Sequence, residues 1–174
     1  SNLKTIGLEM GGKSPFIVLD DAKITDDLID NAINSAFWNG GQNCSANMRQ
    51  IIHSKVKDEF LDKVIKKVKA LKVGDPLDPT SNMGSMISKK HLATVDGFIQ
   101  KGIDEGAKLL FGGVSGKDQK GFYAKPTLFD NLKEDMTISQ EEIFGPVLGI
   151  LTINNTEEAL KVASNSKYGL HASV

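Results

Sequence analysis

This 174-residue sequence contains one cysteine and three histidines. A single cysteine, Cys44, excludes a disulfide within the chain. The histidines, His53, His91 and His171, lie far apart along the sequence and have no Cys, Asp or Glu at metal-ligand spacing, so a metal site has no support from the sequence. The sequence also lacks the pattern G-x-G-x-x-G, so no dinucleotide phosphate loop is predicted.

Neither an excess of one charge nor a long apolar run is present. The 21 basic and 22 acidic residues give a net charge of −1, which provides no global field to attract nucleic acid or an anionic membrane. No stretch resembles a signal sequence or approaches the roughly 18 apolar residues of a membrane-spanning helix. The sequence therefore predicts a cytoplasmic protein with no nucleic-acid or membrane partner.

Apolar periodicity predicts strands that alternate with helices, in a chain long enough for one domain. The predicted helices cover residues 25–38, 56–71, 88–105 and 156–165, and the predicted strands or extended runs cover 5–8, 50–53, 108–111, 122–129 and 147–153. This alternation is typical of an α/β domain whose largely parallel sheet is covered by helices. Glycines at 112, 113, 116 and 121 predict a surface loop.

Both ends of the sequence look truncated. Residues 5–8 resemble a strand with nothing before it, and residues 171–174 stop as another extended apolar run begins. Chains that start and stop on strands are more often excised pieces of a larger protein than complete domains.

Cys44 follows the glycines and amides of residues 39–43, directly after a predicted helix. A structural cysteine is normally embedded among apolar residues, whereas this setting leaves backbone N–H groups available to stabilise a thiolate. The pattern favours a nucleophile. The alternative is an ordinary buried cysteine.

Two further runs could carry chemistry. Glu9 precedes two glycines that allow close backbone approach; it could serve a site at a strand end, or it could simply cap the turn by accepting hydrogen bonds from Gly11 and Gly12. Glu142 and Phe144 lie just before a Gly-Pro turn. Glu142 follows Glu141, and an acidic pair before a turn is usually part of the solvated surface.

Taken together, three of these runs resemble the signatures of the aldehyde dehydrogenase superfamily in order and spacing. They are Leu-Glu-Met-Gly-Gly-Lys-Ser-Pro at 8–15, Gly-Gln-Asn-Cys at 41–44 and Glu-Ile-Phe-Gly-Pro-Val at 142–147. The resemblance extends over essentially the whole chain, including connectors at 72–79 and 165–170. Met10, where many members carry leucine, is a volume-conserving departure.

The resemblance implies a two-step covalent mechanism. The Cys44 thiolate would attack an aldehyde to give a thiohemiacetal, which would pass hydride to NAD or NADP and leave an acyl-thioester. Glu9 would then activate a water for hydrolysis, so the product would be a carboxylic acid. Glu142 would hold hydroxyls of the nicotinamide ribose, and Phe144 would pack near the nicotinamide.

The resemblance also implies what residues 1–174 would not contain. They would form the thiol-bearing catalytic domain. The dinucleotide-binding half would be absent from this chain, and it would carry the phosphate loop and the asparagine that completes the oxyanion hole. The isolated chain should therefore keep a modifiable Cys44 but show little or no turnover, and the full-length protein would be a homo-oligomer. Asn43, Ser45 and residues 47–49 look most like enzymes that oxidise aminoaldehydes.

Two other functions remain open at this point. A cysteine hydrolase that cleaves acyl groups would pair Cys44 with a histidine, for which His53 is the best placed. A non-catalytic remnant of the same fold would carry Cys44 as an ordinary thiol.

Overall fold

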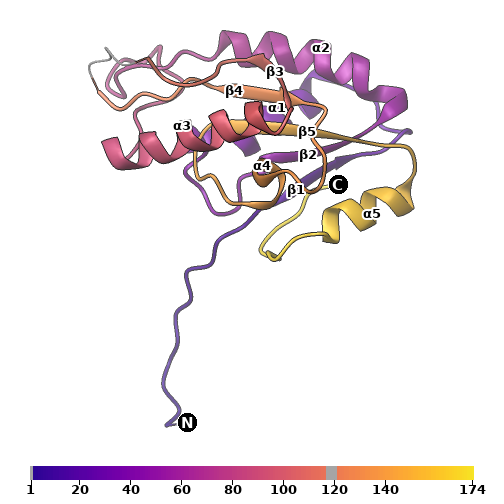
Figure 1. Ribbon diagram of the computed structural model, residues 1–174, viewed down its shortest axis with the longest axis horizontal. Coiled ribbons are helices and arrows are strands. Elements are labelled where there is room, and N and C mark those ends of the chain that lie inside the picture. Colours follow the sequence, from indigo (N-terminus) through magenta and orange to yellow (C-terminus); the bar gives the residue numbers. More distant parts are fainter. Residues whose placement is uncertain (1, 117–120) are drawn as a thin grey trace.

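The computed structural model describes residues 2–116 and 121–174, which form a five-stranded sheet covered by helices on both faces (Figure 1). The strands are β1 (Pro15–Val18), β2 (Arg49–His53), β3 (Lys108–Phe111), β4 (Thr127–Asp130) and β5 (Val147–Ile153). Their spatial order is β1-β2-β5-β4-β3. All neighbouring pairs are parallel except β3 with β4, so the prediction of a largely parallel α/β sheet is confirmed.

The described residues contain five α-helices, and most are capped by the residues that precede them. They are α1 (Asp26–Phe37), α2 (Ser54–Ala70), α3 (Lys89–Asp104), α4 (Thr137–Gln140) and α5 (Thr156–Ser164). The side chains of Thr25, Ser88 and Asn155 each accept a backbone N–H in the first turn of the helix that follows, which satisfies donors that the helix cannot pair internally. None of the helices within the described residues is long and apolar enough to cross a membrane.

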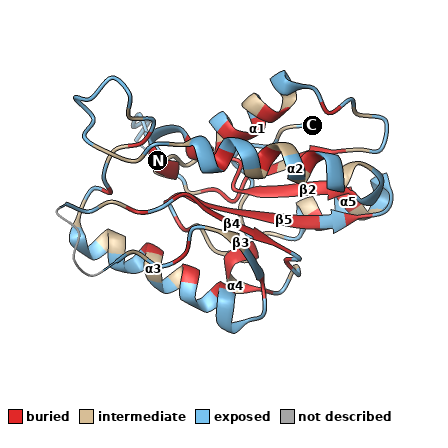
Figure 2. Ribbon diagram, turned by 90° about the horizontal axis from the view of Figure 1, so that it is seen from above, coloured by how far each residue is buried: buried red, intermediate tan, exposed pale blue. Residues whose placement is uncertain are grey.

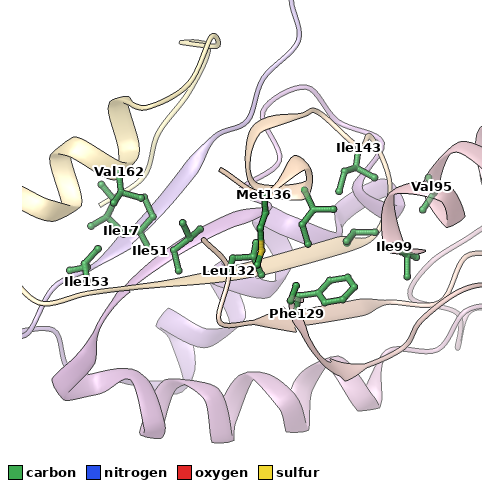
Figure 3. Packing of buried hydrophobic residues seen from close by; sticks show 14 of the residues in the cluster. Ile17, Ile51, Val95, Ile99, Phe129, Leu132, Met136, Ile143, Ile153 and Val162 are labelled. Atoms are coloured by element: carbon green, nitrogen blue, oxygen red, sulfur yellow. The ribbon is translucent and has the colours of Figure 1, made fainter. Parts of the chain in front are cut away.

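Alternating side chains of the strands pack into two separate hydrophobic cores. Ile51 and Leu151 face one side, together with residues of α3, α4 and α5, and Figure 3 shows this cluster packed around Phe129 and Met136. Their neighbours Ile52 and Ile150 face the other side, against α1 and α2. Because successive side chains of a strand point to opposite faces, the near-continuous burial of β2 and β5 in Figure 2 requires helices on both faces.

Several boundaries differ from the sequence predictions. Residues 5–8 form no strand, because an extended segment needs a neighbouring strand to satisfy its backbone groups and none is supplied by the described residues. The extended run 122–129 contributes only its last part, as β4. The predicted extended C-terminal run is present as a bridge between Ser173 and Phe16 beside β1. Residues 117–120, within the predicted glycine loop, lie outside the described residues.

Candidate active site

The three motifs lie directly before three adjacent parallel strands. The run that contains Gly12 leads into β1, the run that contains Cys44 leads into β2, and the run that contains Glu142 leads into β5. Because the sheet order is β1-β2-β5 and all three strands are parallel, the three loops meet at the same edge of the sheet. The expectation that Glu9 follows a strand is therefore wrong: this site is built at the amino ends of the strands, whereas α/β sheets usually place sites at the carboxyl ends.

The loop that carries Cys44 begins with an unusual backbone turn. Asn39, Gly40 and Gly41 all have left-handed φ values, of 53°, 63° and 71°, at the end of the short 3₁₀ segment Trp38–Gly41. Three consecutive residues of this kind reverse the chain sharply after α1, and two glycines make the conformation accessible. The chain then forms a turn closed by the hydrogen bond from the Ala46 N–H to the Asn43 carbonyl.

Cys44 lies within that turn and is half-buried. Its Sγ lies 3.9 Å from Oδ1 of Asn43, and the same amide oxygen accepts hydrogen bonds from the N–H and the hydroxyl of Ser45. The Cys44 N–H donates to no acceptor in the described part of the chain. The thiol is thus reachable, and its own backbone N–H is available as an oxyanion donor.

Glu142 joins the first motif to the third. Its Oε1 accepts a hydrogen bond of 3.1 Å from the Gly12 N–H, across 130 positions of sequence. A Cβ at Gly11 would lie 2.4 Å from Oε2 of the same carboxylate, so only glycine permits this approach. The alternative interpretation, in which Glu9 caps this turn, is wrong: the carboxylate that accepts the glycine amide belongs to Glu142.

The nucleophile loop contacts both of the other loops through glycine. A Cβ at Gly12 would lie 2.3 Å from the Cys44 carbonyl oxygen, and a Cβ at Gly41 would lie 2.5 Å from the Gly145 carbonyl oxygen. All three pairs of motifs are therefore in direct contact. The glycines are needed because backbone packs on backbone, with no room for a side chain between the loops.

Gly12→Ala is expected to destabilise the protein by about 1 to 3 kcal/mol, because the added methyl group forces the first loop away from the Cys44 carbonyl. The control is Gly97→Ala on the exposed side of α3, where a Cβ meets nothing within 4 Å. Alanine is the better helix former, so this change should stabilise the protein by about 0.5 to 1 kcal/mol. Urea unfolding of both variants measures the two shifts, and equal shifts would contradict the contact.

Phe144 has a strained backbone that His91 holds in place. Its φ is +56°, which is rare for an aromatic residue, and its side chain is 39% exposed. Nε2 of His91 lies 2.6 Å from the Phe144 carbonyl oxygen, and the two rings meet edge to face with centroids 6.2 Å apart. No sequence signal pointed to His91, because the contact depends on how α3 packs beside the loop before β5.

Glu9 lies on an exposed N-terminal segment that runs away from the rest of the domain (Figure 1). Its side chain forms no hydrogen bond or ion pair with the residues that the structure describes. Apolar Ile6, Leu8 and Met10 alternate along the same segment and are each more than half exposed. The structure thus places Glu9 three residues before Gly12 without bringing its carboxylate onto Cys44.

His53, Asn47 and Arg49 each form hydrogen bonds with the surrounding scaffold. Nε2 of His53 lies 2.8 Å from the Asn154 carbonyl, and its Nδ1 accepts the Lys55 N–H as the cap of α2, so both ring nitrogens are engaged away from Cys44. The Asn47 amide donates to the Pro15 carbonyl. The guanidinium of Arg49 donates to backbone carbonyls at the end of α5, where the helix dipole favours a cation.

The arrangement is that of a thiol site. A half-buried cysteine with an available backbone N–H lies on a loop that packs against a glycine loop, and the Glu142 carboxylate is bound to that glycine loop. Such a site suits nucleophilic attack on a carbonyl group.

Comparison with known proteins identifies the family. The family model described as the aldehyde dehydrogenase family matches residues 1–174, and the chain belongs to this family. It is 46% identical over 172 residues to a protein of Staphylococcus saprophyticus assigned as an aldehyde dehydrogenase, covering 97% of this chain and 36% of that protein. The chain thus spans only about a third of this relative's length.

Solved structures of dehydrogenases also match this chain in fold and sequence. A 3,6-anhydro-L-galactose dehydrogenase in complex with NAP superposes with a TM-score of 0.89 at 42% identity, over 94% of this chain and 35% of that one. An NAD-dependent aldehyde dehydrogenase from Sinorhizobium meliloti superposes with a TM-score of 0.93 at 36% identity, over 98% of this chain and 34% of that one.

Proposed function

We propose that residues 1–174 are the thiol-bearing catalytic domain of an NAD(P)-dependent aldehyde dehydrogenase that produces carboxylic acids. The observation that carries the proposal is the mutual contact of the three loops around Cys44, which lie up to 130 positions apart in sequence. Family membership supports an oxidoreductase, and the named relatives include an NAD-dependent enzyme.

The Cys44 thiolate adds to the aldehyde carbon, and the resulting oxyanion accepts a hydrogen bond from the Cys44 N–H. A nicotinamide cofactor held beside Glu142 and Phe144 would supply the hydride acceptor for this oxidation. Cys44 would then carry the acyl group as a thioester. Water then cleaves the C–S bond, releasing the acid and regenerating the thiolate. The proposal needs no residue other than Cys44 to form a covalent bond.

Glu142 and Phe144 fit the role of cofactor positioning. Oε1 of Glu142 is anchored by the Gly12 N–H, which fixes the carboxylate and leaves Oε2 free to accept a ribose hydroxyl. Phe144 offers an exposed ring on a backbone that His91 holds rigid. The two side chains come from one loop, so a bound dinucleotide would be located relative to Cys44 by the same contacts that join the loops.

Glu9 is proposed as the base that activates the hydrolytic water. This role requires the N-terminal segment to fold over the site once the rest of the polypeptide covers its exposed apolar residues. Enclosure of the segment would bring this carboxylate to the water that attacks the thioester.

The remaining elements of the proposal concern the longer protein. Dinucleotide binding is assigned to polypeptide outside this chain, and the full-length enzyme is proposed to be a cytoplasmic homo-oligomer. The proposal of an aminoaldehyde substrate rests mainly on Asn43 and Ser45 beside the thiol, because Asn47, Met48 and Arg49 are buried. The structure offers no support for a Cys–His hydrolase, because His53 is engaged at α2.

A graft tests the proposal. The segment of the S. saprophyticus relative that matches this chain is replaced by residues 1–174, and reduction of NAD and NADP is followed at 340 nm with simple and amino-substituted aldehydes. The graft is expected to oxidise an aldehyde, whereas the isolated chain is expected to show no turnover above background. The unmodified relative serves as the activity control. A graft that folds and binds the nucleotide, yet oxidises no aldehyde that the relative accepts, would refute the proposal.

A further inference from the structure

A second concave site lies between the start of β1 and the segment after α5. It is a cavity of about 430 Å³ whose lining includes Lys13, Ser14, Arg49, Tyr168 and His171. The lining contains the basic side chains of Lys13, Arg49 and His171 and no carboxylate. The basic groups of this cavity therefore face an open volume without a counter-charge in its wall.

Three donors at the cavity have no partner. The Lys13 side chain is only 4% exposed and forms no hydrogen bond or ion pair with another described residue. The Ser14 hydroxyl and the Nε–H of Arg49 are also buried without a hydrogen bond in the described part of the chain. Buried polar groups are nearly always paired, so the unpaired Ser14 hydroxyl and Arg49 Nε–H call for an acceptor that is not part of this chain, and the Lys13 side chain lines the same cavity.

The charge on Lys13 is costly in this setting. Burial, and then the nearby positive charge of Arg49, lower the pKa of Lys13 to about 7, while the carboxylates of Glu142 and Glu141 act in the opposite direction. Arg49 is itself fixed by carbonyl groups at the end of α5 and cannot turn away. An oxyanion in the cavity would satisfy Lys13, Ser14 and Nε of Arg49 together.

We propose that this cavity is an oxyanion site that takes a carboxylate or phosphate group, held by Lys13, Ser14 and Arg49. The group can come from two sources: a small free anion, or an acidic side chain of the polypeptide that surrounds this segment in a longer protein such as the relatives. The inference does not depend on the chemistry of Cys44.

Titration of the isolated chain with sodium acetate tests the site. ¹H–¹⁵N spectra are recorded at pH 6.0 with increasing acetate at constant sodium concentration, against sodium chloride. Saturable shifts are expected at the amides of Ser14, Gly169 and Ala172 and at Nε of Arg49, with acetate and not with chloride. Acetate keeps its charge between pH 6 and 8.5, so at pH 8.5 its affinity should fall about tenfold as Lys13 loses its proton.

Variants assign the effect to the lysine. Lys13→Met, which keeps the length of the side chain, should weaken acetate binding at pH 6.0 at least about tenfold, whereas the exposed Lys90→Met should leave it unchanged. His171→Gln should keep the pH dependence, which separates the contribution of Lys13 from that of the histidine in the same wall. Acetate shifts that resist Lys13→Met, or that chloride reproduces, would overturn the proposal.

The graft distinguishes the two sources. If a side chain of the surrounding polypeptide fills the cavity, the graft will not respond to acetate although the isolated chain does. If the natural occupant is a free anion, both proteins will respond. Absence of any saturable response in the isolated chain overturns the inference and leaves the proposed aldehyde chemistry untouched, since aldehyde oxidation by the graft is measured separately.

Discussion

Cys44→Ser in the graft is expected to lower aldehyde oxidation by about 10⁴-fold or more. Serine preserves the turn of Asn43–Ala46 but replaces the nucleophile by a hydroxyl that is almost entirely protonated at neutral pH, so the first covalent step is lost. The measurement is the rate of nucleotide reduction in both the first turnover and the steady state. Both should disappear together.

Two further variants show whether the loss of activity comes from the thiol itself. Ser45→Ala removes a hydroxyl bonded to the same Asn43 oxygen and should change the rate only several-fold, because the thiol is untouched. Glu9→Gln should preserve the first equivalent of reduced nucleotide but slow the steady state, because acylation precedes the hydrolysis that Glu9 is proposed to assist. Substantial steady-state turnover by Cys44→Ser would exclude the thiol mechanism.

Lys13→Met is expected to stabilise the isolated chain at pH 6.5 by up to about 5 kcal/mol. The pKa of Lys13 is about 7 in the folded protein and near its ordinary value of 10.5 in the unfolded chain, so below pH 7 folding buries an ammonium group at a cost of this order. Methionine fills a similar volume and carries no charge. Urea unfolding in chloride buffers measures the gain.

The pH dependence of that gain identifies its cause. Between about pH 7 and 10.5 the unfolded state holds the Lys13 proton and the folded state does not, so the free energy of unfolding of the natural sequence rises with pH. The advantage of Lys13→Met should therefore shrink by about 2 to 3 kcal/mol between pH 6.5 and 9.0. Lys90→Met, on the exposed start of α3, should show no such trend. An advantage that is equal at both pH values would contradict the buried charge.

Local patterns of sequence were enough to predict most of the scaffold. Thr25 and Ser88 marked helix starts because side-chain caps act within three residues, and the alternation of Ile51 with Ile52 belongs to a strand buried on both faces. β1 was missed because Pro15 and its neighbours are recognisable as a strand only from their pairing with β2. Residues 5–8 carry strand periodicity, but periodicity does not supply a neighbour to pair with.

The site was only partly predictable for a related reason. Motif resemblance singled out Cys44, Glu9, Glu142 and Phe144, but which groups touch is decided by the sheet order. The bond from Gly12 to Glu142 and the support of Phe144 by His91 link positions 130 and 53 residues apart, so no local pattern encodes them. The burial of Lys13 could not be predicted from the sequence either, because it depends on α5 and the segment that follows it.

The position of β5 also determines when the sheet can form during synthesis of the chain. β5 is the last strand of the sheet in sequence, yet it lies in the middle, between β2 and β4. Until β5 has left the ribosome, the parallel pair β1–β2 and the antiparallel pair β3–β4 have no strand to join them, and the Glu142 loop is not positioned to bind Gly12. Such distant pairing makes closure slow. A nascent chain stalled before residue 147 would expose both halves to chaperones and carry an unassembled thiol.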